Sequence, residues 1–71
     1  MYILLEIQTE NGTTSLLPAL TYTDRYQAES EFYTKLSYAA VSEVDVHTVL
    51  LIDEHGNVLK REFYEHISTG E

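Results

Sequence analysis

The sequence predicts an α+β domain in which a four-stranded, mainly antiparallel sheet carries one helix packed on one face, in the order ββαββ. Three observations predict this fold. Apolar and polar residues alternate near both ends, turn residues divide each end into a hairpin, and a segment with helical periodicity lies between the hairpins. At 71 residues the chain is expected to be a single domain over residues 1–67, followed by a flexible tail at 68–71.

The first hairpin is predicted from an alternating strand over residues 2–9 and the dipeptide Asn11-Gly12. Asn-Gly readily takes the two positive φ angles of a type I′ turn. The facing pairs across such a turn are all apolar: Ile7 with Leu16, Leu5 with Pro18, and Ile3 with Leu20. Because Pro18 has no N–H to donate, the second strand is expected at a sheet edge or with a bulge.

A helix is predicted from Arg25 to Val41, capped by Asp24 with Gln27 three residues later. The arc facing the sheet is expected to hold Tyr26, Ala28, Phe32, Tyr33, Leu36, Ala39 and Ala40. Glu29 is a polar residue within this apolar stripe. We expect its carboxylate to reach past the sheet edge toward Arg25; the alternative is a buried carboxylate in a polar network or ligand site.

The second hairpin is predicted from the aliphatic run of residues 46–52 and a returning strand over residues 58–67. Glu54-His55-Gly56 forms the turn, with Gly56 in the left-handed conformation. The expected facing pairs on one side are Leu51 with Leu59, Val49 with Arg61, and His47 with Phe63, and on the other Ile52 with Val58, Leu50 with Lys60, and Val46 with Tyr64.

One helix covers only one face of such a sheet, so the other face is expected to lie open. The residues predicted on the open face are Tyr2, Leu4, Leu17 and Ala19, together with one apolar side of the second hairpin. Tyr38 on the outer side of the helix and Tyr64 are further candidate contact residues, because tyrosine is favoured at interfaces. An uncovered apolar face commonly marks an interface, and a chain this short has a marginal core. A homo-oligomer, a dimer or larger, is therefore expected.

The charge of the chain narrows the range of partners. Twelve acidic residues against four Lys and Arg give a formal net charge of −8. Direct nucleic-acid binding is not expected, because that affinity comes from cations that neutralise phosphates. The acids are scattered along the chain, which is typical of a solvated surface, and a basic host or phage protein is the other partner expected.

No motif for catalysis, a metal or a cofactor is predicted. The three histidines, His47, His55 and His66, do not have metal-ligand spacing, and cysteine is absent. The serines lack a nucleophile elbow, and the isolated glycines do not form a phosphate-binding loop. We therefore expect no enzyme activity. No apolar run is long enough for a membrane span and no signal peptide is predicted, so a cytoplasmic location is expected.

The chain resembles a group of short uncharacterised proteins encoded by tailed phages and prophages of gram-positive bacteria. The similarity rests on residues 2–8 (YILLEIQ), residues 24–30 (DRYQAES) and residues 44–47 (VDVH). The resemblance implies a setting in the bacterial host cell during infection, with genes for particle assembly as candidate neighbours. It implies no activity and assigns no functional residue.

Three functions are compatible with these observations. The first is a non-enzymatic phage accessory or assembly protein that acts by self-association through the helix-free face. The second is an acidic inhibitor of a host defence or nucleic-acid-binding protein. The third is a small-molecule sponge that binds a nucleotide signal at a subunit interface, where tyrosine side chains and Arg61 supply stacking and charge.

Overall fold

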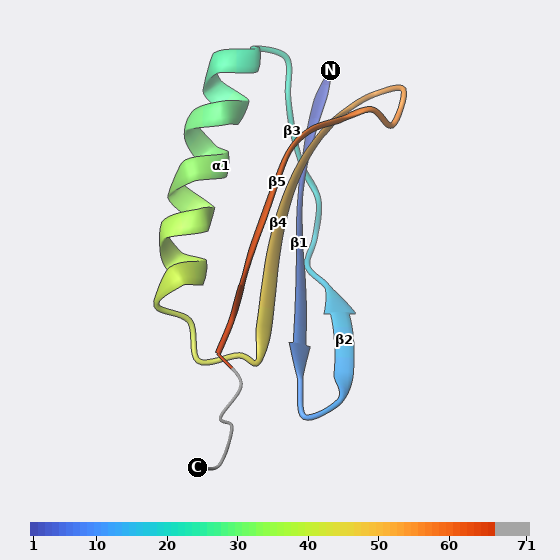
Figure 1. Ribbon diagram of the computed structural model, residues 1–71. Helices are drawn as coiled ribbons and strands as arrows, with labels where there is room; N and C mark the ends of the chain where they lie inside the picture. The colour runs from blue at the N-terminus through green and yellow to red at the C-terminus, as the bar shows by residue number, and fades with distance from the viewer. Residues whose placement is uncertain (67–71) are drawn as a thin grey trace.

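The computed structural model describes residues 1–66, which form one antiparallel sheet with one helix packed against it (Figure 1). The elements in chain order are β1 (Tyr2–Glu10), β2 (Thr13–Leu16), β3 (Leu20–Tyr22), α1 (Arg25–Ala40), β4 (Val46–Asp53) and β5 (Val58–Glu65). The sheet order is β2-β1-β4-β5, with β3 also paired to β1. The predicted α+β class and ββαββ order are confirmed. Ile67 and the predicted tail at 68–71 lie outside the described residues.

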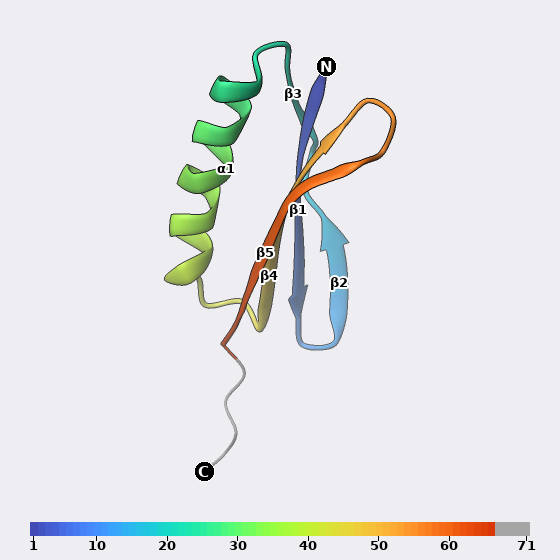
Figure 2. The ribbon, with the colours of Figure 1, turned by 45° about the horizontal axis from the view of Figure 1, so that its top comes forward.

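The first hairpin has the predicted turn, but its register changes part-way along. Asn11 and Gly12 take φ angles of 55° and 79°, as a type I′ turn requires. Ile7 faces Leu16 as predicted, and β2 ends there. Beyond Pro18 the chain resumes as β3, in which Leu20 faces Leu4 and not Ile3. The predicted pairs of Leu5 with Pro18 and Ile3 with Leu20 are therefore wrong. Figure 2 shows β2 and β3 along opposite ends of β1, so the prediction of an interrupted edge strand is confirmed.

Helix α1 begins at the predicted cap and packs a narrow face on the sheet. The Asp24 carboxylate accepts a hydrogen bond from the Tyr26 N–H at 3.0 Å. The buried helix residues are Ala28, Phe32 and Ala39. The predicted arc was too wide, because Tyr26 is 79% exposed and Tyr33 54% exposed. The small alanines bring the helix close to the sheet, and the two tyrosines then fall outside the contact.

The second hairpin contains a bulge that changes all but one of its predicted pairs. Ile52 faces Val58 as expected, but Leu51 faces Lys60, and this one-residue shift continues to the end of β5. Leu59 is the extra residue, and it packs against the core. As a result Phe63 lies beside Thr48, and Tyr64 lies beside His47.

The turn between β4 and β5 is organised by the Asp53 carboxylate. One carboxylate oxygen accepts the backbone N–H groups of His55 and Asn57, each at 2.9 Å, and the other accepts the Asn57 side-chain amide at 2.9 Å. Hydrogen bonding by the Asn57 side chain, then by its backbone, holds the pKa of Asp53 below its usual value of 3.8. Gly56 supplies the left-handed residue, with a φ of 86°.

Asn57→Ala should raise the pKa of Asp53 toward its usual value, because the largest interaction that stabilises the carboxylate is lost. A lowered pKa in the folded state gives stability that is present above the unfolded-state pKa and disappears as the pH falls through the folded value. The variant should therefore lose less stability on acidification through that range. NMR titration of the Asp53 carboxyl measures the shift. His55→Ala is the control, since only its backbone donates, and equal shifts in both variants would contradict this account.

Candidate interaction surface

The two faces of the sheet are the reverse of those predicted. Leu4 is 2% exposed, and Val49 and Leu51 are fully buried, all beneath α1. Ile3, Leu5 and Ile7 alternate with Leu4 along β1 and therefore lie on the helix-free face. The assignment of Leu4 and Tyr2 to the open face is wrong. Because β1 is apolar at both even and odd positions, its alternation alone does not distinguish the two faces.

The remaining candidate contact residues are dispersed. The Leu17 N–H donates to the Glu6 carbonyl, so Leu17 lies beside Glu6 with its half-buried side chain on the helix side of the sheet. Ala19 is exposed between β2 and β3. Tyr38 is 62% exposed on α1, as predicted. Tyr64 is 40% exposed, lies on the helix side of β5, and stacks on His66 with ring centroids 6.2 Å apart. The structure therefore does not bring the predicted candidates together as one surface.

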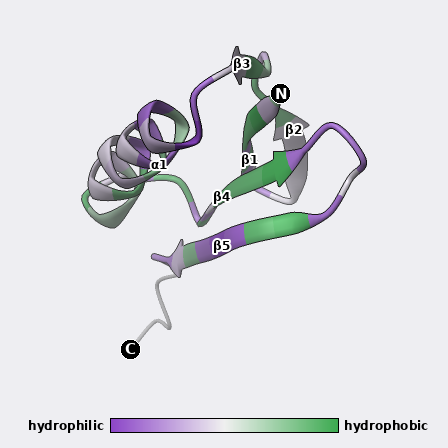
Figure 3. Ribbon diagram, turned by 90° about the horizontal axis from the view of Figure 1, so that it is seen from above, coloured by the Kyte–Doolittle hydropathy of each residue, from purple (hydrophilic) through white to green (hydrophobic). Residues whose placement is uncertain are grey.

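The helix-free face instead carries eight large apolar residues in three rows across the sheet. Ile7 lies between Leu16 and Thr48, with Phe63 beyond Thr48; Leu5 lies beside Leu50; and Ile3 lies beside Ile52, with Val58 beyond. We call these eight the open apolar face: Ile3, Leu5, Ile7, Leu16, Leu50, Ile52, Val58 and Phe63. Within residues 1–66 the only helix lies on the other side of the sheet, as the view from above shows (Figure 3).

Charged groups are nearly absent from the open face. Among the paired strand residues on this side, only Arg61 and Glu65 are charged. They lie on β5 on either side of Phe63. Val46 is a further apolar residue on this side, at the end of the sheet beside Thr9, and the other paired positions are threonines such as Thr48.

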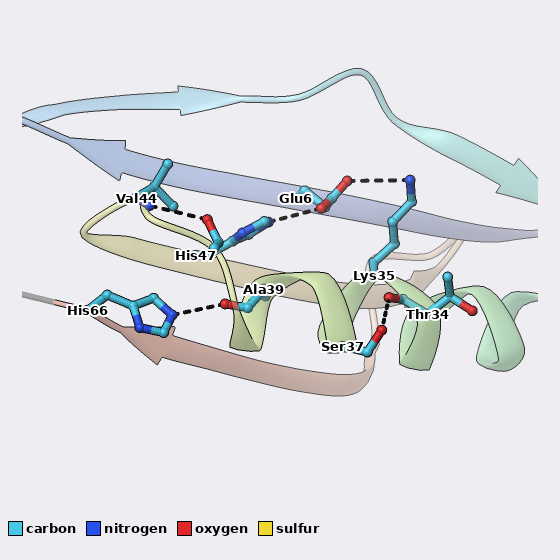
Figure 4. A network of polar contacts seen from close by, with 9 residues as sticks. Glu6, Thr34, Lys35, Ser37, Ala39, Val44, His47 and His66 are labelled. Atoms are coloured by element: carbon cyan, nitrogen blue, oxygen red, sulfur yellow. Dashed lines mark hydrogen bonds and ion pairs between the residues drawn. The ribbon is translucent and has the colours of Figure 1, made fainter.

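Polar side chains lie instead beneath the helix. His47 is 4% exposed, and its Nε2 lies 2.9 Å from Oε2 of Glu6 on β1. The other oxygen of Glu6 is 4.0 Å from Nζ of Lys35 on α1, and Figure 4 shows Glu6 between the two. The Nδ1 atom of His47 is buried and has no hydrogen-bond partner within the described residues. The sheet thus buries a polar cluster on its helix side while its other side is apolar.

A groove of about 440 Å³ lies between α1 and β5. The residues lining it are Phe32, Tyr33, Leu36, Lys60, Arg61, Glu62 and Tyr64. Nζ of Lys60 is 5.4 Å from the centroid of the Tyr33 ring. Hydrogen bonding to the Tyr33 side chain raises the pKa of Lys60 above its usual value. The groove therefore combines aromatic walls with two cationic residues, Lys60 and Arg61, and one acidic residue, Glu62.

Glu29 behaves as an ion-pair residue. Its Oε2 lies 2.9 Å from Nε of Arg25, one turn earlier on α1, which is the arrangement predicted. The alternative of a buried carboxylate at a ligand site is not favoured, because the side chain is 25% exposed and already paired. In the part of the chain that the structure describes, no three histidine or carboxylate side chains gather as a metal site would require.

No family model, curated protein or solved structure matches this chain. The resemblance to phage proteins therefore stays a prediction. The one helix in the described residues is too short to cross a membrane.

The Glu6–His47 pair should be coupled strongly enough to measure. Glu6→Leu leaves the buried imidazole without the one hydrogen-bond partner that it has within residues 1–66. We expect this to cost about 2 kcal/mol in the free energy of unfolding. The double variant Glu6→Leu/His47→Leu also removes the imidazole of His47, so no buried polar group of this pair is left without a partner. We therefore expect the double variant to be more stable than Glu6→Leu alone, measured by urea denaturation. Additive losses would contradict this coupling.

Proposed function

We propose that this protein is a non-enzymatic self-associating protein, in which the open apolar face packs against the same face of a second copy. The observation that carries the proposal is the inverted distribution of side chains. Besides its apolar core, the covered side of the sheet holds Glu6, His47 and Lys60. The uncovered side holds eight large apolar residues and only two charged ones, Arg61 and Glu65. An exposed sheet face in a stable monomer is normally the polar one.

The size of the two apolar sets supports a second layer. The buried core consists of Leu4, Ala28, Phe32, Ala39, Val49 and Leu51, and two of these six are alanines. The five strands within residues 1–66 together contain 32 residues. With strands ~4.8 Å apart and ~3.3 Å per residue, the sheet spans roughly 500 Å² in projection. Side-chain relief makes the accessible area larger than the projection, so it approaches the roughly 800 Å² per partner of a specific interface. Stacked sheets of this kind pack about 10 Å apart.

A second copy is the partner that best fits the charges. The chain carries −8 overall, but the open apolar face has one cation and one anion, Arg61 and Glu65. These two opposite charges nearly cancel, so two copies of this face can meet without the repulsion that the net charge of the chain implies. The remaining acids lie away from this contact, so their repulsion across the interface is weak.

The biological role proposed is that of an accessory or assembly protein of a tailed phage or prophage. It rests on the resemblance of residues 2–8, 24–30 and 44–47 and on the self-association proposed above. The alternative role as an acidic inhibitor of a host protein rests on net charge alone.

The interface is tested with two matched lysine variants. Leu5→Lys places a charge in the centre of the open apolar face and should halve the mass of the assembly, raising its dissociation constant by about 100-fold or more. Tyr26→Lys makes the same change in net charge at an exposed helix position, and the mass should stay that of the unchanged protein. Light scattering at micromolar concentration measures both masses, and thermal melts confirm that both variants fold.

A strict monomer in the unchanged protein would overturn the proposal. So would an assembly that is equally stable with Leu5→Lys and Tyr26→Lys.

The groove between α1 and β5 supports a second candidate function, the binding of a nucleotide or a similar aromatic anion. Its volume of about 440 Å³ lies within the usual range for small-molecule sites. Tyr33 and Tyr64 offer surfaces for stacking, and Lys60 offers a positive charge.

A panel of nucleotides tests this candidate by thermal stabilisation. A ligand at 100 times its dissociation constant should stabilise the fold by about 2.7 kcal/mol, and Lys60→Gln should abolish the shift. No shift at saturating concentrations with any member of the panel would remove nucleotide binding from consideration.

A further inference from the structure

Strand β5 has a long free edge. It is the last strand in the sheet order, and β4 is its only partner within residues 1–66. The opposite edge of the sheet is shorter and broken, because β2 and β3 are separate strands with Pro18 between them. A further strand could therefore form a longer unbroken ladder on β5 than on the opposite edge. The bulge at Leu59 limits this ladder to residues 60–65.

The backbone groups that face outward from β5 can be assigned. The N–H of His66, just beyond β5, donates to the Asp45 carbonyl at 2.7 Å and so points toward β4. In an antiparallel ladder the direction of the backbone groups alternates along the strand. The N–H and C=O groups of Arg61, Phe63 and Glu65 therefore point outward, away from β4.

We propose that β5 pairs antiparallel with β5 of a second copy, about a two-fold axis through Phe63 perpendicular to the sheet, so that two sheets join edge to edge. In this register Phe63 faces Phe63 of the other copy. Arg61 and Glu65 of each copy form hydrogen-bonded pairs with Glu65 and Arg61 of the other. Every outward N–H from Arg61 to Glu65 then has a carbonyl acceptor.

The charges on β5 distinguish this register from its neighbours. Residues paired across the two strands must have their side chains on the same side of the joined sheet. The allowed alternative registers are therefore those in which the two-fold axis moves along β5 from Phe63 to another single residue. The next two registers toward the turn place Glu62 opposite Glu62 and then Arg61 opposite Arg61. Like charges directly opposite each other destabilise a strand pair, whereas opposite charges stabilise it. The next register toward the C-terminus pairs Tyr64 with Tyr64 and has no like-charge pair, but it has no Arg61–Glu65 pair either. Only the pairing centred on Phe63 gives two Arg61–Glu65 pairs.

Charged residues on an edge strand usually oppose pairing with other chains. On β5 they oppose most registers and favour one, because Arg61 and Glu65 are placed symmetrically about Phe63. Non-specific addition of other strands is thus suppressed while self-pairing is permitted.

The edge contact is separate from the stacking of open apolar faces proposed above. Its two-fold axis is perpendicular to the sheet, whereas the stacking axis lies parallel to it.

Residue-resolved amide hydrogen exchange on the full chain tests the edge contact. The outward amides of Arg61, Phe63 and Glu65 should exchange at least about 100-fold more slowly than solvent-exposed amides, and this protection should fall on dilution. The inward amides of Glu62 and Tyr64 are the internal control, since their bonds to β4 protect them in every state. If the outward amides exchange freely in a protein that is still oligomeric, the edge contact is overturned and face stacking stands.

A complementation experiment tests the register in the Leu5→Lys background, where face stacking is disrupted. The edge dimer should persist in Leu5→Lys and should weaken at least about 10-fold with either Arg61→Glu or Glu65→Arg added. An equimolar mixture of those two variants should regain the dimer, because the two acidic side chains of one variant then face the two arginines of the other. Mass by light scattering reports this, and a mixture that stays monomeric would overturn the proposed register.

Discussion

A β-sheet has two faces, and strand alternation sends side chains to both. In this chain one 16-residue helix, α1, packs against a single face, and its small residues Ala28 and Ala39 allow the close approach. The other face consists of apolar side chains from four strands, with no helix in residues 1–66 to cover it. Much of what the protein can do follows from this asymmetry, because Leu16, Val58 and Phe63 on the helix-free face are 63%, 59% and 51% exposed.

The covered side of the sheet, in contrast, buries polar side chains. A carboxylate and an imidazole, Glu6 and His47, occupy positions beneath the helix that apolar residues could fill. Burying such a pair costs desolvation free energy that their mutual attraction only partly recovers. A domain of this size with so small a core has little stability to spare. A second layer over Ile3, Leu5, Ile7 and Leu50 would add the apolar burial that the core lacks.

The local features of the fold could be predicted from the sequence, whereas the long-range pairing could not. Asn11-Gly12, Asp24 and Gly56 each fix a turn or cap through their own backbone preferences. Which face of β1 is covered depends on neighbours far along the chain, because Leu4 and Leu5 are equally apolar. The single-residue shifts at Pro18 and Leu59 reassign the facing pairs beyond them. The open face comprises Ile3, Leu5 and Ile7, and not the predicted Tyr2, Leu4 and Leu17, because α1 packs over Leu4.

The most direct measurement of the account is an isotope-filtered NMR experiment on a mixture of labelled and unlabelled protein. It detects contacts only between different copies of the chain. The account predicts intermolecular contacts among the methyl groups of Ile3, Leu5, Ile7 and Leu50, and none from Leu4. A protein that gives no contact between copies from these methyl groups at millimolar concentration would contradict it.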